Sequence, residues 1–404
     1  MSIQNKILTK LNSVIKHDSS TPFNYERFLV FDKAQYLDAF ILGKPLGPFE
    51  LEIQTSSSCN LACTWCIGEQ IQSKNPIRNL PNLINKNNID TLVDGILEMH
   101  IGVKSLDTVK FSGFIGDPLI QKEATLRAIK RLHKAGIKVG LFTNGTLMTG
   151  DTWEILSKID YVHISLDAGP ESFYPLKEYH LRGRINDSET FDKVLDNIKG
   201  LNYLRKANGG GVKINIGYVI VEGNHHEIYK TAGLVKDAGA DMVRLKFDIS
   251  ASYDKKTPWL KEAFSQMEKA KSDYHRPNEF SVCSIHSPDA LKRNSHTDWT
   301  CDRGCYLQHF MATIGSDGNM YLCDHNTLQG AVAFGNTVNN SFYSIWNSNR
   351  RKSLSGDVKN ICQSNVCPPF GNRINLFMSE IMELKKEYGA EAVVGALKQL
   401  RIKS

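Results

Sequence analysis

Three cysteines lie close together early in the chain, at Cys59, Cys63 and Cys66. Thiolates are the usual ligands of iron–sulfur clusters, and a cubane cluster has four irons. Three thiolates would hold three irons and leave the fourth open, so that a small molecule could chelate it. The alternatives are three unrelated cysteines or part of a zinc site, although zinc sites favour paired cysteines two residues apart. The spacing therefore favours a cluster with one open iron.

This C-x3-C-x2-C spacing resembles the signature of the radical S-adenosylmethionine (SAM) superfamily. The resemblance implies a SAM-binding [4Fe–4S] cluster on Cys59, Cys63 and Cys66, whose open iron takes the amino and carboxylate groups of SAM. It also implies that an electron from a flavodoxin- or ferredoxin-type reductant splits SAM to a 5′-deoxyadenosyl radical. Trp65 stands where the superfamily is often aromatic, so it would cover the cluster or pack against adenine; ordinary packing is the alternative.

The elements that would position these cysteines follow from hydrophobic periodicity. The expected strands span residues 49–55, 108–112, 138–142, 161–166, 213–221 and 242–247. The expected helices span residues 89–101, 122–135, 151–159, 189–204 and 226–238. Alternating strands and helices predict a parallel sheet, which right-handed crossovers close into part of a barrel. The predicted fold class is α/β, a partial (β/α)6 TIM-like barrel with its functional groups at the C-terminal ends of the strands.

Short motifs follow three of the predicted strands. Gly116 and Asp117 precede a proline and resemble the superfamily's Gly-Gly-Glu-Pro motif, whose backbone and carboxylate meet the SAM amino group. Asp replaces the usual Glu here. Asn144 lies in a Thr-Asn-Gly turn like that of many relatives, and Ser165 and Asp167 resemble a Ser-Leu-Asp motif that approaches the ribose of SAM. Taken singly, these segments are also ordinary turns or caps.

Two cations alternate with apolar residues in the sixth predicted strand. Arg244 and Lys246 are two residues apart, so they share one face of the strand. If that face lines the barrel interior, the two cations need an anion, either the SAM carboxylate or an acidic group of the substrate. A solvated pair on the outside is the alternative.

A second group of cysteines comprises Cys305, Cys323, Cys362 and Cys367. Residues 311–323 between the first two predict a β-hairpin with a Gly-Ser-Asp-Gly turn. This arrangement resembles the SPASM and Twitch extensions that follow radical SAM barrels. The resemblance implies one auxiliary [4Fe–4S] cluster in an irregular C-terminal domain of hairpin and helices. Four thiolates would also suit zinc.

Two cysteines remain outside both groups, Cys283 and Cys301. Free buried cysteines are the simplest interpretation. The functional alternative is a catalytic thiol that returns hydrogen to a substrate radical, as radical SAM epimerases use. Cys301 could also replace Cys305 as a cluster ligand. Asp324 and His325, next to a predicted ligand, are candidates for polar contacts with substrate.

The chain of 404 residues is long enough for more than one domain. We expect a helical N-terminal segment over 1–48, the barrel over 49–250, a linker and auxiliary-cluster domain over 251–377, and a C-terminal helix over 378–404. The region from Cys283 onward shows little strand or helix pattern of its own, which predicts stabilisation by a metal cluster.

Composition excludes several functional classes. The net charge of +6 comes without a long block of lysine or arginine, so we expect no nucleic-acid partner. The N-terminus has no apolar signal segment and no apolar run is long enough for a membrane span, which predicts a cytoplasmic protein. Nine cysteines in such a chain favour metal ligation over disulfides.

Together these features predict a radical SAM oxidoreductase or epimerase. The short N-terminal segment favours a small-molecule substrate, such as a sugar or aminocyclitol in natural-product biosynthesis, because many peptide-modifying relatives carry a larger peptide-binding module there. The outcome would be dehydrogenation, with the auxiliary cluster accepting an electron, or epimerisation, with a thiol returning hydrogen. The alternatives are a maturase of a ribosomally made peptide and a non-enzymatic iron–sulfur or zinc protein in binding or electron transfer, which would need no open iron.

Overall fold

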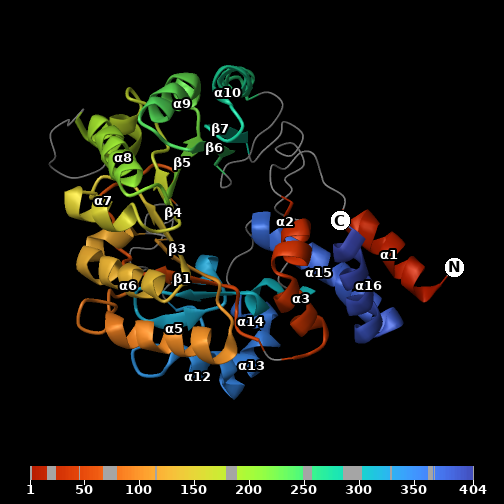
Figure 1. Ribbon diagram of the computed structural model, residues 1–404. Helices are drawn as coiled ribbons and strands as arrows, with labels where there is room; N and C mark the ends of the chain where they lie inside the picture. The colour runs from red at the N-terminus through yellow and green to blue at the C-terminus, as the bar shows by residue number, and fades with distance from the viewer. Residues whose placement is uncertain are drawn as a thin grey trace.

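The protein is represented by a computed structural model that describes residues 2–15, 24–44, 46–66, 80–113, 116–178, 189–248, 257–284, 303–327, 330–362, 367 and 369–403. Within these residues a single ten-stranded sheet runs in the order β10-β9-β8-β1-β2-β3-β4-β5-β6-β7 (Figure 1). The strands are β1 (Glu50–Gln54), β2 (Thr108–Ser112), β3 (Lys138–Thr143), β4 (Tyr161–Ser165), β5 (Lys213–Ile220), β6 (Met242–Phe247), β7 (Ser281–Ser284), β8 (Met311–Ile314), β9 (Asn319–Tyr321) and β10 (Gly335–Asn336). The sheet is open, because β10 and β7 form its two ends.

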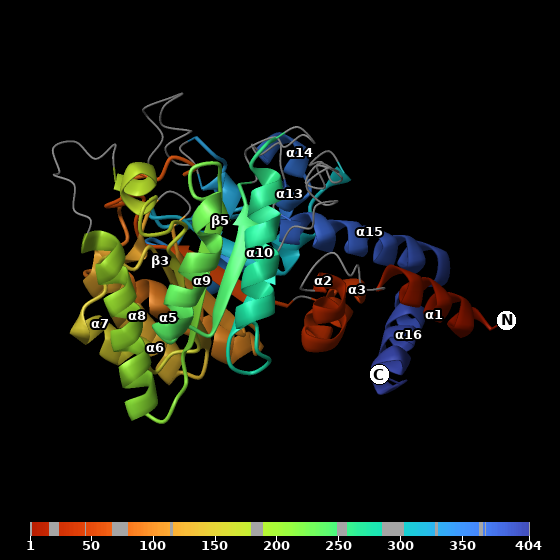
Figure 2. The ribbon, with the colours of Figure 1, turned by 90° about the horizontal axis from the view of Figure 1, so that it is seen from above.

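Helices follow the strands and cover one face of the sheet (Figures 1 and 2). They are α5 (Ile89–Val103), α6 (Lys122–Lys134), α7 (Gly150–Leu156), α8 (Glu189–Ala207), α9 (Ile228–Asp237) and α10 (Leu260–Tyr274). In β6, the alternate residues Val243, Leu245 and Phe247 are buried in the core shared with these helices. Arg244 and Lys246 therefore lie on the opposite, inward face of the curled sheet.

The six predicted strands are all present, and the predicted α/β partial barrel is confirmed. The structure adds two parallel strands from the region that appeared to lack a pattern. β7 pairs with β6, and β8 pairs with β1, so eight neighbouring strands are parallel. The interpretation of the region from Cys283 onward was wrong on this point, because strands of four residues carry too little periodicity to be recognised alone. The hairpin is confirmed, since β8 and β9 are antiparallel.

Short helices complete the C-terminal region around the hairpin. They are α12 (Phe342–Asn347), α13 (Asn349–Ser355) and α14 (Val358–Ile361). α12 contacts α5, and Phe342, Ile345 and Trp346 are buried in the core of the barrel. The auxiliary-cluster region is therefore packed against the barrel through apolar side chains.

A second hydrophobic core joins the two ends of the chain (Figure 2). Its helices are α1 (Ile3–Val14), α2 (Tyr25–Arg27), η1 (Phe28–Asp32), α3 (Ala34–Ile41), α15 (Pro369–Tyr388) and α16 (Ala390–Lys403). The chain ends in two helices, α15 and α16, which are separated at residue 389, where the sequence analysis expected one helix over 378–404. Arg401 donates two hydrogen bonds to the Asp38 carboxylate, at 2.8 and 2.9 Å, and a third to the Val30 carbonyl at 2.7 Å. None of the described helices is both long and apolar enough to cross a membrane.

Arg401→Ala should lower the free energy of unfolding by about 2 kcal/mol, because it leaves the half-buried Asp38 carboxylate without its charged partner. Chemical denaturation followed by circular dichroism measures the change. The control is Lys10→Ala, which removes an ion pair with Glu387 in the same helical unit whose side chains are 56% and 52% exposed. That pair should contribute less than about 1 kcal/mol. Equal losses in the two variants would contradict the proposed importance of the Arg401 pair.

Candidate functional site

The three early cysteines lie on a loop that continues directly from β1. Two backbone hydrogen bonds hold this loop to the turn after β4, from the Ala62 amide to the Lys177 carbonyl at 2.8 Å and from the Thr64 amide to the Leu176 carbonyl at 2.9 Å. A third bond, from the Cys66 amide to a carbonyl three residues earlier, closes the turn between the last two cysteines. The thiols are therefore positioned by the C-terminal edge of the sheet, as the sequence predicted.

The thiols of this loop are close enough to influence one another's charge. Burial, with smaller contributions from Asp167, Cys66 and Cys59, raises the pKa of Cys63 to about 12, although Lys177 acts in the opposite direction. Thiolates in such a place need a strong positive charge, which iron ions would provide. Within the described part of the chain, no three His, Cys, Asp or Glu side chains converge closely enough to hold one metal ion.

Lys177 is a buried cation that the sequence interpretation missed. Its ammonium group donates to the carbonyls of Ser165, at 2.6 Å, and Leu166, at 2.8 Å, and lies 5.0 Å from the centre of the Phe173 ring. Its charge acts on both Cys63 and Asp117. Lys177 therefore links the end of β4 to the cysteine loop. It lies in a π-helical turn, η3 (Tyr174–Glu178), and no motif in the sequence marks it.

Asp117 is 2% exposed and connects the ends of β2 and β3. Its carboxylate accepts hydrogen bonds from the Leu119 amide at 2.9 Å, the Asn144 amide at 2.7 Å and the Thr143 hydroxyl at 2.9 Å. These donors hold the carboxylate in place beside the cysteine loop. The predicted contact with the SAM amino group stays a prediction, while the structure gives Asp117 a positioning role.

Gly116 lies against the same loop. A β-carbon there would stand 2.2 Å from the Ser56 carbonyl oxygen, so only glycine fits without a shift of the backbone. The next amide, of Asp117, donates to the Ser58 carbonyl at 2.9 Å. The two residues before the glycine in the predicted motif, 114 and 115, lie outside the described residues.

Asn144 reaches the first cysteine directly. Its amide nitrogen donates to the Cys59 sulfur at 3.6 Å and to the Asn60 side chain at 3.0 Å. Its oxygen accepts from the backbone and hydroxyl of Thr146, at 2.9 and 2.7 Å. Asn144 is thus held rigidly beside a predicted iron ligand. Trp65 lies half-buried in the turn between the last two cysteines, and its predicted contact with cluster or adenine is not tested.

Asp167 and Ser165 stand at the end of β4, as predicted. Asp167 adopts a left-handed conformation with φ 53°, and its carboxylate accepts from the Val219 amide at 2.9 Å. A fully buried asparagine, Asn224, donates to the carbonyls of Asp167 and Val219, at 2.9 and 2.7 Å. Sequence reasoning missed Asn224, because its role depends on two strand ends meeting. The Ser165 carbonyl accepts from Lys177, and its contact with ribose remains a prediction.

The inward face of the sheet is charged at β6. Arg244 is in register with Gly217 of β5 and with Cys283 of β7, so the Cys283 side chain shares the inward face. Burial, with the charges of Arg244 and Lys246, lowers the pKa of His163 well below its usual range, which makes this ring neutral. These contacts favour the inward orientation of the two cations over the solvated alternative.

The second cysteine group is gathered around two asparagines. Asn326 donates to the sulfur of Cys323 at 3.3 Å and to that of Cys362 at 3.9 Å. Asn375 of α15 donates to the sulfur of Cys367 at 3.7 Å. Hydrogen bonds to the ligand sulfurs are one of the means by which proteins adjust iron–sulfur clusters. Neither asparagine belongs to a motif that the sequence analysis recognised.

The four thiols of this group also share a desolvated environment. Burial raises the pKa of Cys305 to about 11 and that of Cys367 to about 12, and each is affected by Cys362. Cys323 responds in the same way to Cys305 and Cys362. The structure therefore brings together all four cysteines of the predicted auxiliary site. Cys301, the second spare cysteine, lies outside the described residues.

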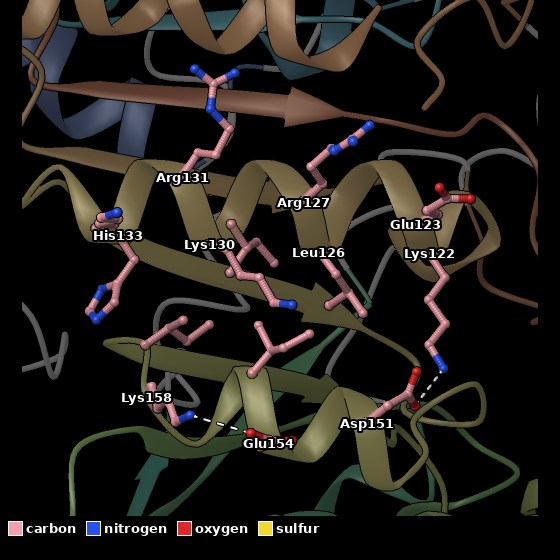
Figure 3. Close-up of a pocket in the computed structure, with 14 residues that line it drawn as sticks. Lys122, Glu123, Leu126, Arg127, Lys130, Arg131, His133, Asp151, Glu154 and Lys158 are labelled. Atoms are coloured by element: carbon pink, nitrogen blue, oxygen red, sulfur yellow. Dashed lines mark hydrogen bonds and ion pairs between the residues drawn. The ribbon is translucent and has the colours of Figure 1, made fainter. Parts of the chain in front are cut away.

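A groove of about 1020 Å³ lies on the outer surface between α6 and α7 (Figure 3). Lys122 and Asp151 pair across one end of it at 2.9 Å, and Lys158 pairs with Glu154 at 3.6 Å. None of the cysteines or strand-end residues lines this groove. It is therefore separate from the candidate site, which faces the inside of the barrel.

Comparison with known proteins supports this geometry. Residues 53–235 match the radical SAM superfamily, and residues 305–368 match SPASM, an iron–sulfur cluster-binding domain. Among curated proteins, the uncharacterized protein MJ0804 of Methanocaldococcus jannaschii is 26% identical over 36% of this chain and 41% of its own length. The tungsten-containing aldehyde ferredoxin oxidoreductase cofactor-modifying protein of Pyrococcus furiosus is 21% identical over 47% of this chain and 49% of its own length. The chain thus spans less than half the length of these two relatives.

Solved structures share the fold. Streptococcus suis SuiB bound to precursor peptide SuiA matches with a TM-score of 0.53 and 16% identity, over 81% of this chain and 70% of that one. The anSMEcpe structure with bound AdoMet matches with a TM-score of 0.51 and 17% identity, over 87% and 96%. Such identities show likeness of fold alone. The two domain matches show that this chain carries a radical SAM domain followed by a C-terminal SPASM domain, and these domains imply SAM and iron–sulfur clusters as its cofactors.

Proposed function

We propose that this radical SAM enzyme dehydrogenates a small-molecule substrate bound inside the barrel. The observation that carries the proposal is a cavity of about 330 Å³ that is lined by strands of the barrel and by Cys323 of the auxiliary site. Its volume is at the small end of ligand pockets. When bound, SAM and its cluster supply a 5′-deoxyadenosyl radical that removes hydrogen from carbon, and the auxiliary cluster supplies an electron acceptor.

The residues of the chain have distinct roles in this proposal. Cys59, Cys63 and Cys66 would hold the SAM-binding cluster, and Asn144 orients the loop through its hydrogen bond to Cys59. Asp117 fixes the neighbouring strand ends rather than reacting.

Dehydrogenation removes one hydrogen atom, one electron and one proton from the substrate. The chain must therefore offer a group that takes the proton. Glu50 lines the cavity, and within the described residues only its Oε1 atom is engaged, with Lys110 at 2.9 Å. Its second oxygen could accept the proton of a substrate hydroxyl group. We expect the reductant to be a flavodoxin or ferredoxin and the setting to be the cytoplasm.

Epimerisation is the second candidate reaction, supported by the position of Cys283 beside Arg244 on the inward face. There its thiol could return hydrogen to the substrate. A peptide is the second candidate substrate, since SuiB, which shares the fold, was crystallised with precursor peptide SuiA. The volume of the cavity favours the small molecule.

Anaerobic reconstitution should give about eight iron and eight sulfide per chain, because seven cysteines would hold two cubanes. Replacing Cys59, Cys63 and Cys66 together with alanine should leave about half of each, as measured by elemental and sulfide analysis. The same variant should lose reductive cleavage of SAM to 5′-deoxyadenosine. One cluster together with stoichiometric zinc in the intact protein would refute the auxiliary cluster.

Cys323→Ala and Cys283→Ala separate the two candidate reactions. If the reaction is dehydrogenation, Cys323→Ala should abolish product while Cys283→Ala keeps it, and the product should be two hydrogens lighter than the substrate by mass spectrometry. In both variants the iron of the SAM-binding cluster should be retained. A product of unchanged mass that carries deuterium from heavy water, lost in Cys283→Ala, would establish epimerisation instead.

Lys177→Met should lower the reduction potential of the SAM-binding cluster by on the order of 50 mV, because a nearby positive charge stabilises the more negative reduced state. A redox titration followed by electron paramagnetic resonance measures the shift. Lys177→Arg keeps the positive charge, so its reduction potential should stay close to that of the unchanged protein. Lys199→Met removes an exposed lysine on α8, which pairs with Asp196 at 2.9 Å, and should leave the potential unchanged. An unchanged potential in Lys177→Met with full iron content would argue against this electrostatic role.

A further inference from the structure

The cavity of about 330 Å³ has two walls of opposite charge. β6 contributes Arg244 to one wall, and β1 and β2 contribute Glu50, Glu52 and Lys110 to the other. These strands are well separated in the sheet order, so the curl of the sheet places them across the interior from one another. Asp324, which follows Cys323 of the auxiliary site, adds a further carboxylate. A ligand in this space would therefore meet a cation on one side and carboxylates on the other.

Arg244 is poorly satisfied by the protein. Its Nε atom is buried and has no hydrogen-bond partner among the described residues. Burial lowers the pKa of its guanidinium group, and interactions with Tyr25, Asp167 and Cys283 oppose that effect. A buried cation without a close anion is costly. Because guanidinium groups bind carboxylates through two parallel hydrogen bonds, Arg244 is suited to receive a carboxylate in the cavity.

The location of the cavity indicates that this anion belongs to the substrate rather than to SAM. None of the strand-end residues predicted to contact SAM lines it; these are Gly116, Asp117, Asn144, Ser165 and Asp167. Lys246, two residues further along β6, does not line it either, and its charge is affected by Asp167 at the end of β4. The two cations of β6 thus serve different sides of the barrel interior, with Lys246 towards the strand ends and Arg244 towards the auxiliary site.

The acidic wall retains capacity for a donor. Lys110 lies 2.9 Å from both Glu50 and Glu52. Glu52 is fully occupied, because it also accepts from Ser112 at 2.5 Å and from Gln54 at 3.1 Å. Two carboxylates share one ammonium group, so this trio carries a net negative charge before Asp324 is added. Glu50, which lines the cavity, therefore keeps one oxygen that can accept from an ammonium or hydroxyl group.

Aromatic and aliphatic side chains contribute much of the remaining lining. Tyr25 and Phe28 come from the N-terminal segment, Phe370 comes from α15, and Met311 and Leu322 come from the hairpin region. Tyr25 and Phe370 meet edge to face with ring centres 4.9 Å apart. The lining therefore offers apolar surface to a carbon skeleton.

We propose that the cavity binds a small substrate with a carboxylate at one end, received by Arg244, and an ammonium or hydroxyl group at the other, received by Glu50 and Asp324. The proposal rests on the proposed function and specifies its substrate class. Such a molecule would place its carbon skeleton between the two charged walls. Glu50 on β1 and Arg244 on β6 define this substrate class. Both lie in strands where polar and apolar side chains alternate, and neither belongs to a recognised motif.

The test uses simple probes on the reconstituted protein with both clusters and SAM present. Isothermal titration calorimetry compares 6-aminohexanoate with hexanoate and hexylamine. The doubly charged probe should bind on the order of tenfold more tightly than either singly charged one. Arg244→Gln should remove the gain in affinity that the carboxylate gives and should leave the affinity for hexylamine unchanged. Arg244→Lys should keep part of that gain. Glu50→Gln should remove the gain in affinity that the ammonium group gives and should leave the affinity for hexanoate unchanged. The two variants test the two walls independently, so one result remains if the other variant fails to fold.

Two outcomes would overturn the proposal. Equal affinities for the three probes, or equal losses in Arg244→Gln and Lys246→Gln, would show that Arg244 does not receive a carboxylate in this cavity. Tighter binding of a tripeptide with blocked ends and a central glutamate than of 6-aminohexanoate would assign the carboxylate to a peptide. The proposed function is tested separately, since failure of the wild-type protein to cleave SAM under reducing conditions would contradict it whatever the probes do.

Discussion

The burial of charge on the inward face of an open parallel sheet is the constraint on which the rest of this structure depends. β1, β2 and β6 present apolar residues to the covering helices and charged residues to the interior, and a charge removed from water needs a partner. Lys110 satisfies Glu50 and Glu52 in this way. At the two groups of cysteines and at Arg244, the described residues leave a buried group without a full set of partners. We expect cofactors at the cysteines and the substrate at Arg244.

The supporting contacts are concentrated where elements from distant parts of the chain meet. Asp117 holds the ends of β2 and β3 together, Lys177 joins the end of β4 to the cysteine loop, and Asn375 of α15 reaches the sulfur of Cys367. The helical unit formed by both chain ends lines part of the cavity with Tyr25 and Phe370. The same packing that stabilises the fold therefore fixes the cysteines and shapes the space between them.

The sequence predicted the parts whose signals are local. Six strands, their helices and both cysteine groups were recognised from periodicity and spacing, because each depends on residues that lie near one another in the chain. β7 was missed because a strand of four residues has little periodicity, and β8, predicted as a strand of the hairpin, was not expected to pair with β1 because that pairing joins distant parts of the chain. Lys177, Asn224 and Asn326 were missed because their partners come from other elements. Glu50 and Glu52 carried a usable signal, since they alternate with apolar residues as Arg244 and Lys246 do.

The central claim is that the protein holds two clusters of different kinds, one with an open iron and one with four protein ligands. Electron paramagnetic resonance of the reduced protein, recorded with and without SAM, tests it most directly. The signal of one cluster should change when SAM is added, because SAM chelates its open iron, while the signal of the other should stay the same. Two unchanged signals, or two signals that both respond to SAM, would contradict the account.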